Sequence, residues 1–279
     1  MAPGGLARAG REAELGQNLA ALRARIAAAC AAAGRSAGEV TLIAVTKTFP
    51  ASDVRLLAGL GITDVGENRD QEAAPKAARC ADLRPPLRWH FIGQLQVNKC
   101  ASVVSYADVV HSVDRMRLVR ALGRRARAAG RTVTCLIQVN LDPAAAGAGH
   151  EQAGHDGAGH DGAGHDGAGH DGAGHDGAGH DEVHRGGAIP ADVPALADAV
   201  AAEDGLLLGG VMAVAPLGAP PGPAFRELAR VSAGLRAAHP RALMISAGMT
   251  GDLEYAIAEG ATHVRVGTAL LGGRRAFVR

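Results

Sequence analysis

The stretch LMISAGMTGDLEYAIAEGATHVRVGT, from Leu243 to Thr268, contains a complete strand–helix–strand unit. Two short apolar runs have the length of buried strands, and the segment between them has the spacing of a helix. Asp252 can cap this helix and Gly260 ends it. The three elements are expected at Leu243–Ser246, Asp252–Glu259 and His263–Val266. A strand, a crossover helix and a second strand form the repeating unit of a parallel sheet.

The same alternation extends through the rest of the chain. Six further strands are predicted at Val40–Val45, Thr63–Val65, Arg88–Ile92, Asp108–Val113, Thr132–Asn140 and Leu206–Val214. Helical spacing precedes the first strand and follows each of the six, in one case after a repeat tract. Eight such strands predict an α/β fold with a single closed (β/α)8 TIM barrel. An open doubly wound sheet is the alternative, but no GxGxxG motif follows the first strand.

A near-perfect AGHDG pentapeptide repeat occupies Ala144 to His184. Its units contain no large apolar side chain, so they cannot offset an ordering cost of roughly 1–2 kcal/mol per residue. We therefore predict a disordered low-complexity insertion at 144–184, with 1–143 and 185–279 forming two parts of one barrel. The histidines and acidic residues of the repeat could bind Zn²⁺ or Ni²⁺ loosely, and a neutral, tolerated expansion is the alternative.

Charge and composition exclude several classes of protein. The repeat contains eight acidic residues and no Lys or Arg, so the remaining 238 residues have a net charge of +9. This suits an anionic ligand, but no Lys/Arg block with interleaved aromatic residues suggests nucleic acid. The four cysteines form no CxxC pair, so no structural zinc site is expected. There is neither an 18-residue apolar run nor a signal-peptide pattern, which predicts a cytoplasmic protein without a membrane span.

Candidate site residues stand where the predicted strands end, the usual place for active sites in this barrel. Lys47 follows the first strand, so its amine is expected in the barrel mouth, where desolvation would favour imine formation with an aldehyde. A solvated surface lysine is the alternative. Glycines and hydroxyls after strands seven and eight are typical of phosphate-binding loops: Ser246, Gly248, Gly267 and Thr268. A lysine opposite a phosphate site suggests pyridoxal phosphate.

Four other residues on these strands or at their ends are further candidates. Arg265 alternates with apolar residues on the last strand, so it is buried either in an internal ion pair or against a ligand ring nitrogen. His90 is expected to be a hydrogen-bonded barrel histidine rather than a base, and Met249 a packing residue. Asn68 either binds a ligand oxygen or caps the next helix.

In its motifs, the chain resembles the pyridoxal phosphate homeostasis protein family, which is similar to the N-terminal barrel domain of alanine racemase. The matching motifs are AVTKTFP, DVGENRDQE, WHFIGQLQVNK, HSVDR, VMAVAP, ISAGMTGDLEYAI and THVRVGTALLG. They lie on both sides of the repeat and cover most of the remaining chain. Two departures from the family pattern are Thr250, where the family often has serine, and the repeat itself.

The resemblance implies that Lys47 holds pyridoxal 5′-phosphate as an internal aldimine. It further implies a phosphate site at Ser246, Gly248, Gly267 and Thr268, Arg265 at the pyridine nitrogen, and a pocket lined by Asn68 and Met249. The implied function is intracellular storage, delivery and buffering of this cofactor by a monomer. Its partners would be the cofactor and, transiently, apoenzymes that depend on it.

An amino-acid racemase is the alternative function. A two-base racemase needs an acid or base on each face of the cofactor. The resembling racemases take a tyrosine from an additional C-terminal domain of a partner subunit, and this chain is expected to lack that domain. Its two tyrosines, Tyr106 and Tyr255, do not stand at strand ends. We therefore expect a carrier without catalytic residues, and leave weak side activity open.

Overall fold

The computed structural model describes residues 3–142 and 186–273. Within these residues, eight parallel strands form a closed barrel in the order of the sequence. The strands are β1 (Thr41–Val45), β2 (Asp64–Glu67), β3 (Arg88–Phe91), β4 (Val109–Val113), β5 (Val133–Gln138), β6 (Leu206–Met212), β7 (Met244–Ser246) and β8 (His263–Val266). The predicted (β/α)8 barrel is confirmed. The insertion predicted at 144–184, with its expected disorder and loose metal binding, lies outside the described residues.

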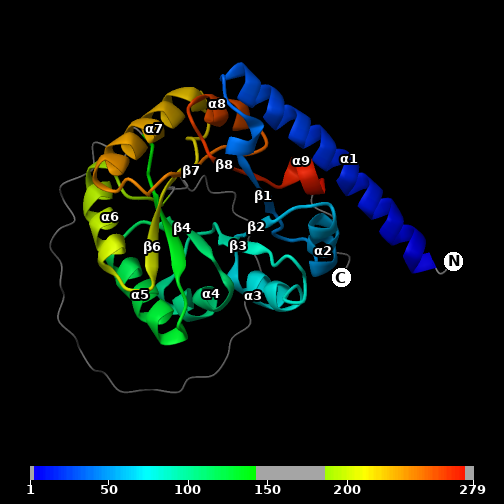
Figure 1. Ribbon diagram of the computed structural model, residues 1–279, viewed down its shortest axis with the longest axis horizontal. Coiled ribbons are helices and arrows are strands. Elements are labelled where there is room, and N and C mark those ends of the chain that lie inside the picture. The colour runs from blue at the N-terminus through cyan, green and yellow to red at the C-terminus, as the bar shows by residue number, and fades with distance from the viewer. Residues whose placement is uncertain (1–2, 143–185, 274–279) are drawn as a thin grey trace, which may run out of the picture.

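Helices surround the barrel (Figure 1). They are α1 (Pro3–Ala32), α2 (Ala51–Gly59), α3 (Asp70–Ala78), α4 (Cys100–Tyr106), α5 (Met116–Ala129), α6 (Val193–Ala202), α7 (Pro221–Ala238), α8 (Leu253–Ala258) and α9 (Thr268–Leu271). Within the described residues, short 3₁₀ turns lie in the connections at Ala37–Glu39, Val97–Lys99 and Pro190–Asp192.

The long helix α1 runs along the outside of the ring past α8, α9 and α2 (Figure 1). Its apolar stripe is buried: Leu15, Leu19, Leu22 and Ile26. The sequence analysis did not predict α9, which is a single turn. Leu270 and Leu271 of this turn are buried, and Asn18 donates a hydrogen bond to the Leu270 carbonyl at 3.1 Å.

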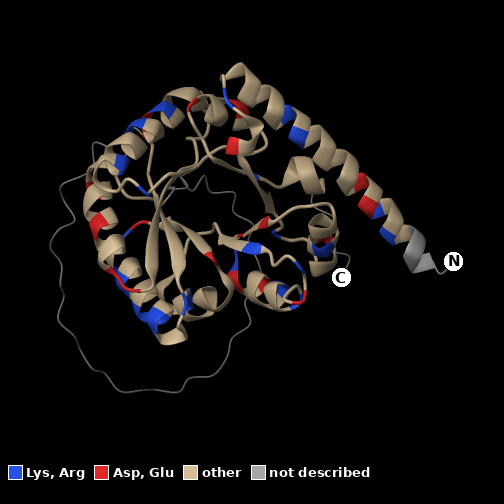
Figure 2. Cartoon of the chain, viewed as in Figure 1, with Lys and Arg blue, Asp and Glu red and all other residues tan. Residues whose placement is uncertain are grey.

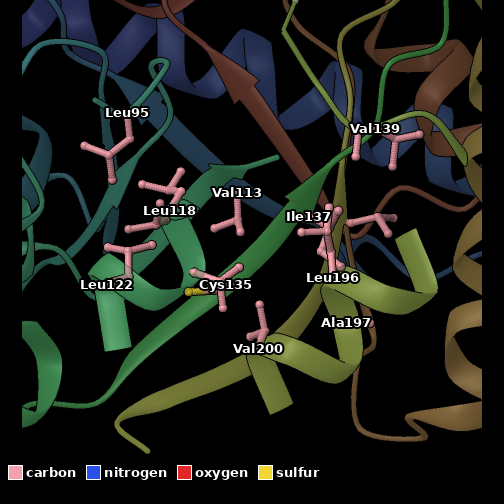
Figure 3. Packing of buried hydrophobic residues seen from close by; sticks show 14 of the residues in the cluster. Leu95, Val113, Leu118, Leu122, Cys135, Ile137, Val139, Leu196, Ala197 and Val200 are labelled. Atoms are coloured by element: carbon pink, nitrogen blue, oxygen red, sulfur yellow. The ribbon is translucent and has the colours of Figure 1, made fainter. Parts of the chain in front are cut away.

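The main apolar core lies between the outer faces of the strands and the helices. Figure 3 shows it where Val113, Cys135 and Ile137 of β4 and β5 pack against α5 and α6. The barrel interior is different, because polar side chains from β2, β3, β4, β7 and β8 are buried there. Those polar residues are Asp64, His90, His111, Ser246, His263 and Arg265.

Charged residues lie mostly on the outer helices (Figure 2), and the charged residues of α5 are all arginines. Within the described residues, no helix combines the length and the apolar composition needed to cross a bilayer. The polar residues that are buried inside the barrel, which could form a site, lie on the strands and not on the outer helices.

Candidate functional site

Lys47 lies just beyond the carboxyl end of β1, at the mouth of the barrel. Thr46 is still fully buried, but Lys47 and Thr48 are exposed in a turn. The expected desolvation of the Lys47 amine is therefore wrong for this structure. The strand ends at Val45, and the turn that follows carries the Lys47 side chain into solvent. Thr48 has φ +69°, a conformation that residues other than glycine rarely adopt.

Helix α3 holds the backbone on both sides of Lys47. Lys76 donates to the Thr46 carbonyl at 2.8 Å, and the Thr48 amide donates to Glu72 Oε2 at 3.0 Å. Lys76 and Glu72 are four residues apart and therefore share one helix face. The turn that carries Lys47 is thus fixed by α3, which the sequence analysis had treated only as a helix.

Glu67 completes this arrangement beneath the turn. Lys76 Nζ lies 2.5 Å from Glu67 Oε1, and the Thr46 hydroxyl donates to the same oxygen at 2.6 Å. Glu67 and Lys76 are both buried. Burial raises the pKa of Glu67 above its ordinary value, and the Lys76 charge opposes that rise. Among the described residues, Glu67 Oε2 has no hydrogen-bond partner.

The loops after β7 and β8 meet beside β1, because β8 pairs with β1 and with β7. Gly248 has φ +89°, and a Cβ there would lie 2.7 Å from the Ala256 Cβ. A Cβ on Gly267 would lie 3.2 Å from the Val45 carbonyl oxygen. At both positions the backbone packs so closely against neighbouring chain that a side chain would collide or crowd. Thr268 is exposed at the start of α9.

The structure corrects the prediction for Met249 and removes one of the two alternatives for Asn68. Met249 is 38% exposed, so its prediction as a packing residue is wrong. It stands at the tip of the loop, where its amide donates to Asp252 Oδ1 at 2.6 Å. Asn68 does not cap α3, whose N-cap is Arg69. Its Oδ1 is buried without a partner among the described residues, so the role of ligand contact stays a prediction.

A cleft of about 410 Å³ opens beside Asn68 between the loops after β2 and β3. Basic and amide side chains line much of it, among them Arg69, Gln94, Lys99 and Arg115. The cleft therefore extends the polar surface of the barrel mouth on the side away from β7 and β8.

Arg265 is buried inside the barrel, as its strand position predicted. Its Nη1 donates to the carbonyl and the hydroxyl of Ser246, both at 2.7 Å, and Nη2 donates to the Ala213 carbonyl at 2.8 Å. Among the described residues, no carboxylate forms a salt bridge with it, so the internal ion pair is not observed. Burial lowers the pKa of Arg265 to about 10 against the opposing charge of Asp252.

Two histidines extend these contacts across the barrel. His111 Nδ1 lies 3.0 Å from the Ser246 hydroxyl, and His111 Nε2 lies 2.8 Å from His90 Nδ1. His90 Nε2 lies 2.8 Å from Asp64 Oδ1. The expectation that His90 is a hydrogen-bonded barrel histidine is confirmed. Sequence reasoning missed His111 and Asp64, although His111 stands in the middle of a predicted buried strand.

Burial keeps both histidines neutral. It lowers the pKa of His111 well below the ordinary value, and it lowers the pKa of His90 although Asp64 opposes that shift. Burial alone would raise the pKa of Asp64, but hydrogen bonds from His90 and Thr63 bring it below the ordinary value. The carboxylate is therefore ionised and the rings are uncharged near neutral pH.

The comparisons with known proteins agree on one family. Residues 180–275 match the model of the alanine racemase N-terminal domain. The pyridoxal phosphate homeostasis protein of Mycobacterium tuberculosis is 38% identical over 283 aligned residues, which cover 95% of each chain. PipY of Synechococcus elongatus, solved with PLP bound, is 31% identical with a TM-score of 0.70, covering 92% of this chain and all of PipY.

A more distant structure shows the shared fold alone. The alanine racemase of Streptomyces coelicolor is 19% identical with a TM-score of 0.61, and the match covers 90% of this chain but 58% of the racemase. Identity above 30% over nearly the whole length of the homeostasis protein decides the assignment. The chain belongs to the pyridoxal phosphate homeostasis protein family.

Proposed function

We propose that this protein binds pyridoxal 5′-phosphate at the barrel mouth through Lys47 and acts in the cytoplasm as its carrier. One observation supports this most directly: Lys47 and the glycine loops of β7 and β8 lie at the same end of three neighbouring strands. A carrier of this kind stores, delivers and buffers the cofactor. The relatives named for its homeostasis, and PipY with PLP bound, support the ligand class.

The lysine content of the chain supports Lys47 as the attachment residue. The sequence contains three lysines, Lys47, Lys76 and Lys99. The ammonium of Lys76 is buried and bound to Glu67 and Thr46, so it is not available to a ligand. Lys99 lies in the turn before α4. Lys47 alone follows a barrel strand directly.

The proposed site residues fit the parts of the cofactor. Gly248, Gly267 and Thr268 are assigned to its phosphate, because they lie in the loops after β7 and β8, where barrels of this kind commonly bind phosphate. Ser246 is assigned to the same group and Arg265 to the ring nitrogen, while Asn68 and Met249 line the pocket. Asn68 Oδ1 is buried and has no hydrogen-bond partner among the described residues, so a donor on a bound ligand could pair with it. When bound, the cofactor supplies an electrophilic aldehyde.

The positions of the tyrosines favour a carrier over a racemase. Tyr106 lies at the end of α4 with its ring 6.5 Å from that of Trp89, and Tyr255 is 55% exposed on α8. Neither follows a strand, so neither is placed to act as the second base. A permanent guanidinium at the ring nitrogen would also keep that nitrogen unprotonated and weaken the ring as an electron sink.

We assign 1–143 and 185–279 to one barrel domain and expect a monomer that contacts recipient apoenzymes transiently. No nucleic acid partner is expected, since the sequence has no Lys/Arg block with interleaved aromatic residues, and no membrane partner is expected.

The test is covalent mapping of the cofactor. After incubation with pyridoxal 5′-phosphate and borohydride reduction, the label should be found on the peptide that contains Lys47. Lys47→Ala should lose visible absorbance and label, whereas Lys99→Ala, the matched control, should keep both. Retention of the same reducible adduct in Lys47→Ala would refute the assignment.

A further inference from the structure

Five polar side chains cross the barrel interior in a continuous hydrogen-bonded series, here named the polar relay. In order, they are Arg265, Ser246, His111, His90 and Asp64. They come from β8, β7, β4, β3 and β2, and all are buried. The relay joins the residues assigned to cofactor binding to a carboxylate at the start of β2.

The two ends of the polar relay fix the direction of every hydrogen bond. Arg265 can only donate, so the Ser246 oxygen accepts from Nη1. The ionised Asp64 can only accept, so His90 has its proton on Nε2. A neutral His90 then accepts at Nδ1 from the Nε2–H of His111. His111 accepts at Nδ1, and the Ser246 hydroxyl hydrogen therefore points toward His111 and not toward the barrel mouth.

In this forward arrangement Ser246 has no hydrogen to donate to an anion. The reversed arrangement supplies one: His111 donates from Nδ1 to Ser246, and His90 donates from Nδ1 to His111. His90 keeps its Nε2–H against Asp64, so it becomes an imidazolium. The Ser246 oxygen then accepts two hydrogen bonds and donates one, which is the full capacity of a hydroxyl. Compared with the forward arrangement, the reversed one holds one additional proton, taken from solvent.

We propose that anion binding at the barrel mouth reverses the polar relay and is coupled to the uptake of one proton by the Asp64–His90 pair. His111 is then the positioning residue that decides whether Ser246 can donate. The proposal rests on the proposed function, because it assumes that Ser246 meets the cofactor phosphate. The solvent proton has an entry point, since the Asp64 side chain is 10% exposed while that of His90 is fully buried.

The charges around the polar relay explain why binding and proton uptake occur together. Arg88 and Arg265 oppose a positive His90–His111 unit, and neutral His263 on β8 lies close by, with its ring 6.4 Å from that of His90. Asp64 and Asp108 favour it, and Asp252 faces Arg265. Without a ligand the burial penalty prevails and the rings stay neutral. A bound phosphate adds negative charge at the Ser246 end and shifts this balance toward the protonated form.

The test uses pyridoxine 5′-phosphate, which has no aldehyde and cannot react with Lys47. Its dissociation constant is measured calorimetrically from about pH 7 to about pH 8.5, where a phosphate monoester is already mostly dianionic because its second pKa is about 6. As pH rises, coupled uptake of one proton weakens wild-type binding by up to about tenfold per pH unit. Heats in two amine-free buffers of different ionisation enthalpy count the protons directly.

Three variants separate coupling from packing. Asp64→Asn keeps an oxygen that accepts from His90 but removes the charge that the additional proton needs, so its binding should take up one proton fewer than that of wild type. His111→Phe keeps a ring and breaks the series, with the same expected result. His263→Gln, the matched control, alters a neighbouring barrel histidine outside the relay and should behave as wild type. Equal proton uptake in wild type and Asp64→Asn would overturn the proposal.

Nitrogen-15 NMR of the histidine rings, recorded on the free protein and then with the probe added, shows which ring nitrogens are protonated. His90 and His111 should both be neutral with the proton on Nε2, and the probe should move the His111 proton to Nδ1. A free-protein His111 with its proton on Nδ1 overturns the forward arrangement. If no reduced label forms on Lys47, the proposed function fails and the coupling fails with it. If the label forms but the probe does not bind, or binds without a tautomer change, the coupling alone fails.

Discussion

The carbonyl oxygen of Thr46 accepts a hydrogen bond of 2.8 Å from the buried ammonium of Lys76. This contact ties the buried residue that follows β1 to helix α3, one residue before the lysine assigned to the cofactor. The same ammonium neutralises Glu67, so positioning of the turn and burial of a carboxylate depend on one side chain.

Lys76→Met should destabilise the fold strongly. Removing the ammonium leaves the buried Glu67 carboxylate unpaired, a change that costs about 3–5 kcal/mol of unfolding free energy. The double variant Lys76→Met with Glu67→Gln should recover most of the loss, because no buried charge remains. Urea unfolding of both single variants and of the double variant gives the coupling energy. Simple additivity of the two single effects would contradict the pairing.

Gly248→Ala should lower the melting temperature and weaken phosphate binding. Alanine at φ +89° is strained by about 1–3 kcal/mol, and its Cβ would lie 2.7 Å from that of Ala256. Gly251→Ala is the matched control in the same loop, because a Cβ there meets nothing within 4 Å and its φ is not positive. Thermal unfolding with and without inorganic phosphate measures both effects. Equal shifts for the two variants would show that the loop conformation is not the cause.

Acid should destabilise the protein below about pH 6.5, before the carboxylates titrate. Burial lowers the pKa of His263 to about 4, and it lowers the pKa values of His90 and His111. Between these values and about 6.5, the unfolded chain binds protons that the folded chain does not, so stability present above pH 6.5 is lost as pH falls. His263→Gln should flatten this dependence in urea unfolding at several pH values. An unchanged slope would contradict the depressed pKa.

The protein should not racemise alanine at rates typical of enzymes, which have a median turnover of about 10 s⁻¹. The physical reason is the absence of a tyrosine at a strand end among the described residues, so the second face of the cofactor lacks a base. A chiral amino-acid assay with the cofactor-loaded protein checks this. Turnover near the enzymatic median would overturn the carrier assignment and favour the racemase.

Replacement of residues 144–184 by a short glycine linker should leave the melting temperature and cofactor binding nearly unchanged. The chain segments that flank the tract already lie side by side. The Asn140 amide donates to the Ala188 carbonyl, and the Ala188 amide donates to the Gln138 carbonyl, both at 2.8 Å. Each doubling of loop length changes the closure cost by only about 0.6 kcal/mol. Loss of the cofactor or a collapse in melting temperature would show a structural role, and loss of metal binding alone would favour a loose chelator.

Local spacing predicted the barrel well because each strand and helix has its own apolar period. The prediction of β8 has the same bounds as the strand in the structure, and Gly130 ends α5 in a left-handed conformation as its residue type suggests. The candidate site was predicted only in part. His111 meets Ser246 across 135 positions of sequence, a contact that only barrel closure and strand register create. The exposure of Lys47 depends on where one turn leaves β1, which propensity does not determine.

The hydrogen bonds of Ala188 with Asn140 and Gln138 also join two pieces of the molecule, one on each side of the repeat. Five strands precede them and three follow, and the β5–β6 ladder continues directly into this contact. Covalent continuity between residues 142 and 186 therefore adds little to barrel closure. Two separately expressed fragments, cut between these positions, have complementary edges at β5–β6 and β8–β1 and should reassemble without a peptide link. The same location is suited to new termini in a circular permutant, since a break there interrupts none of the strand pairs of the described residues.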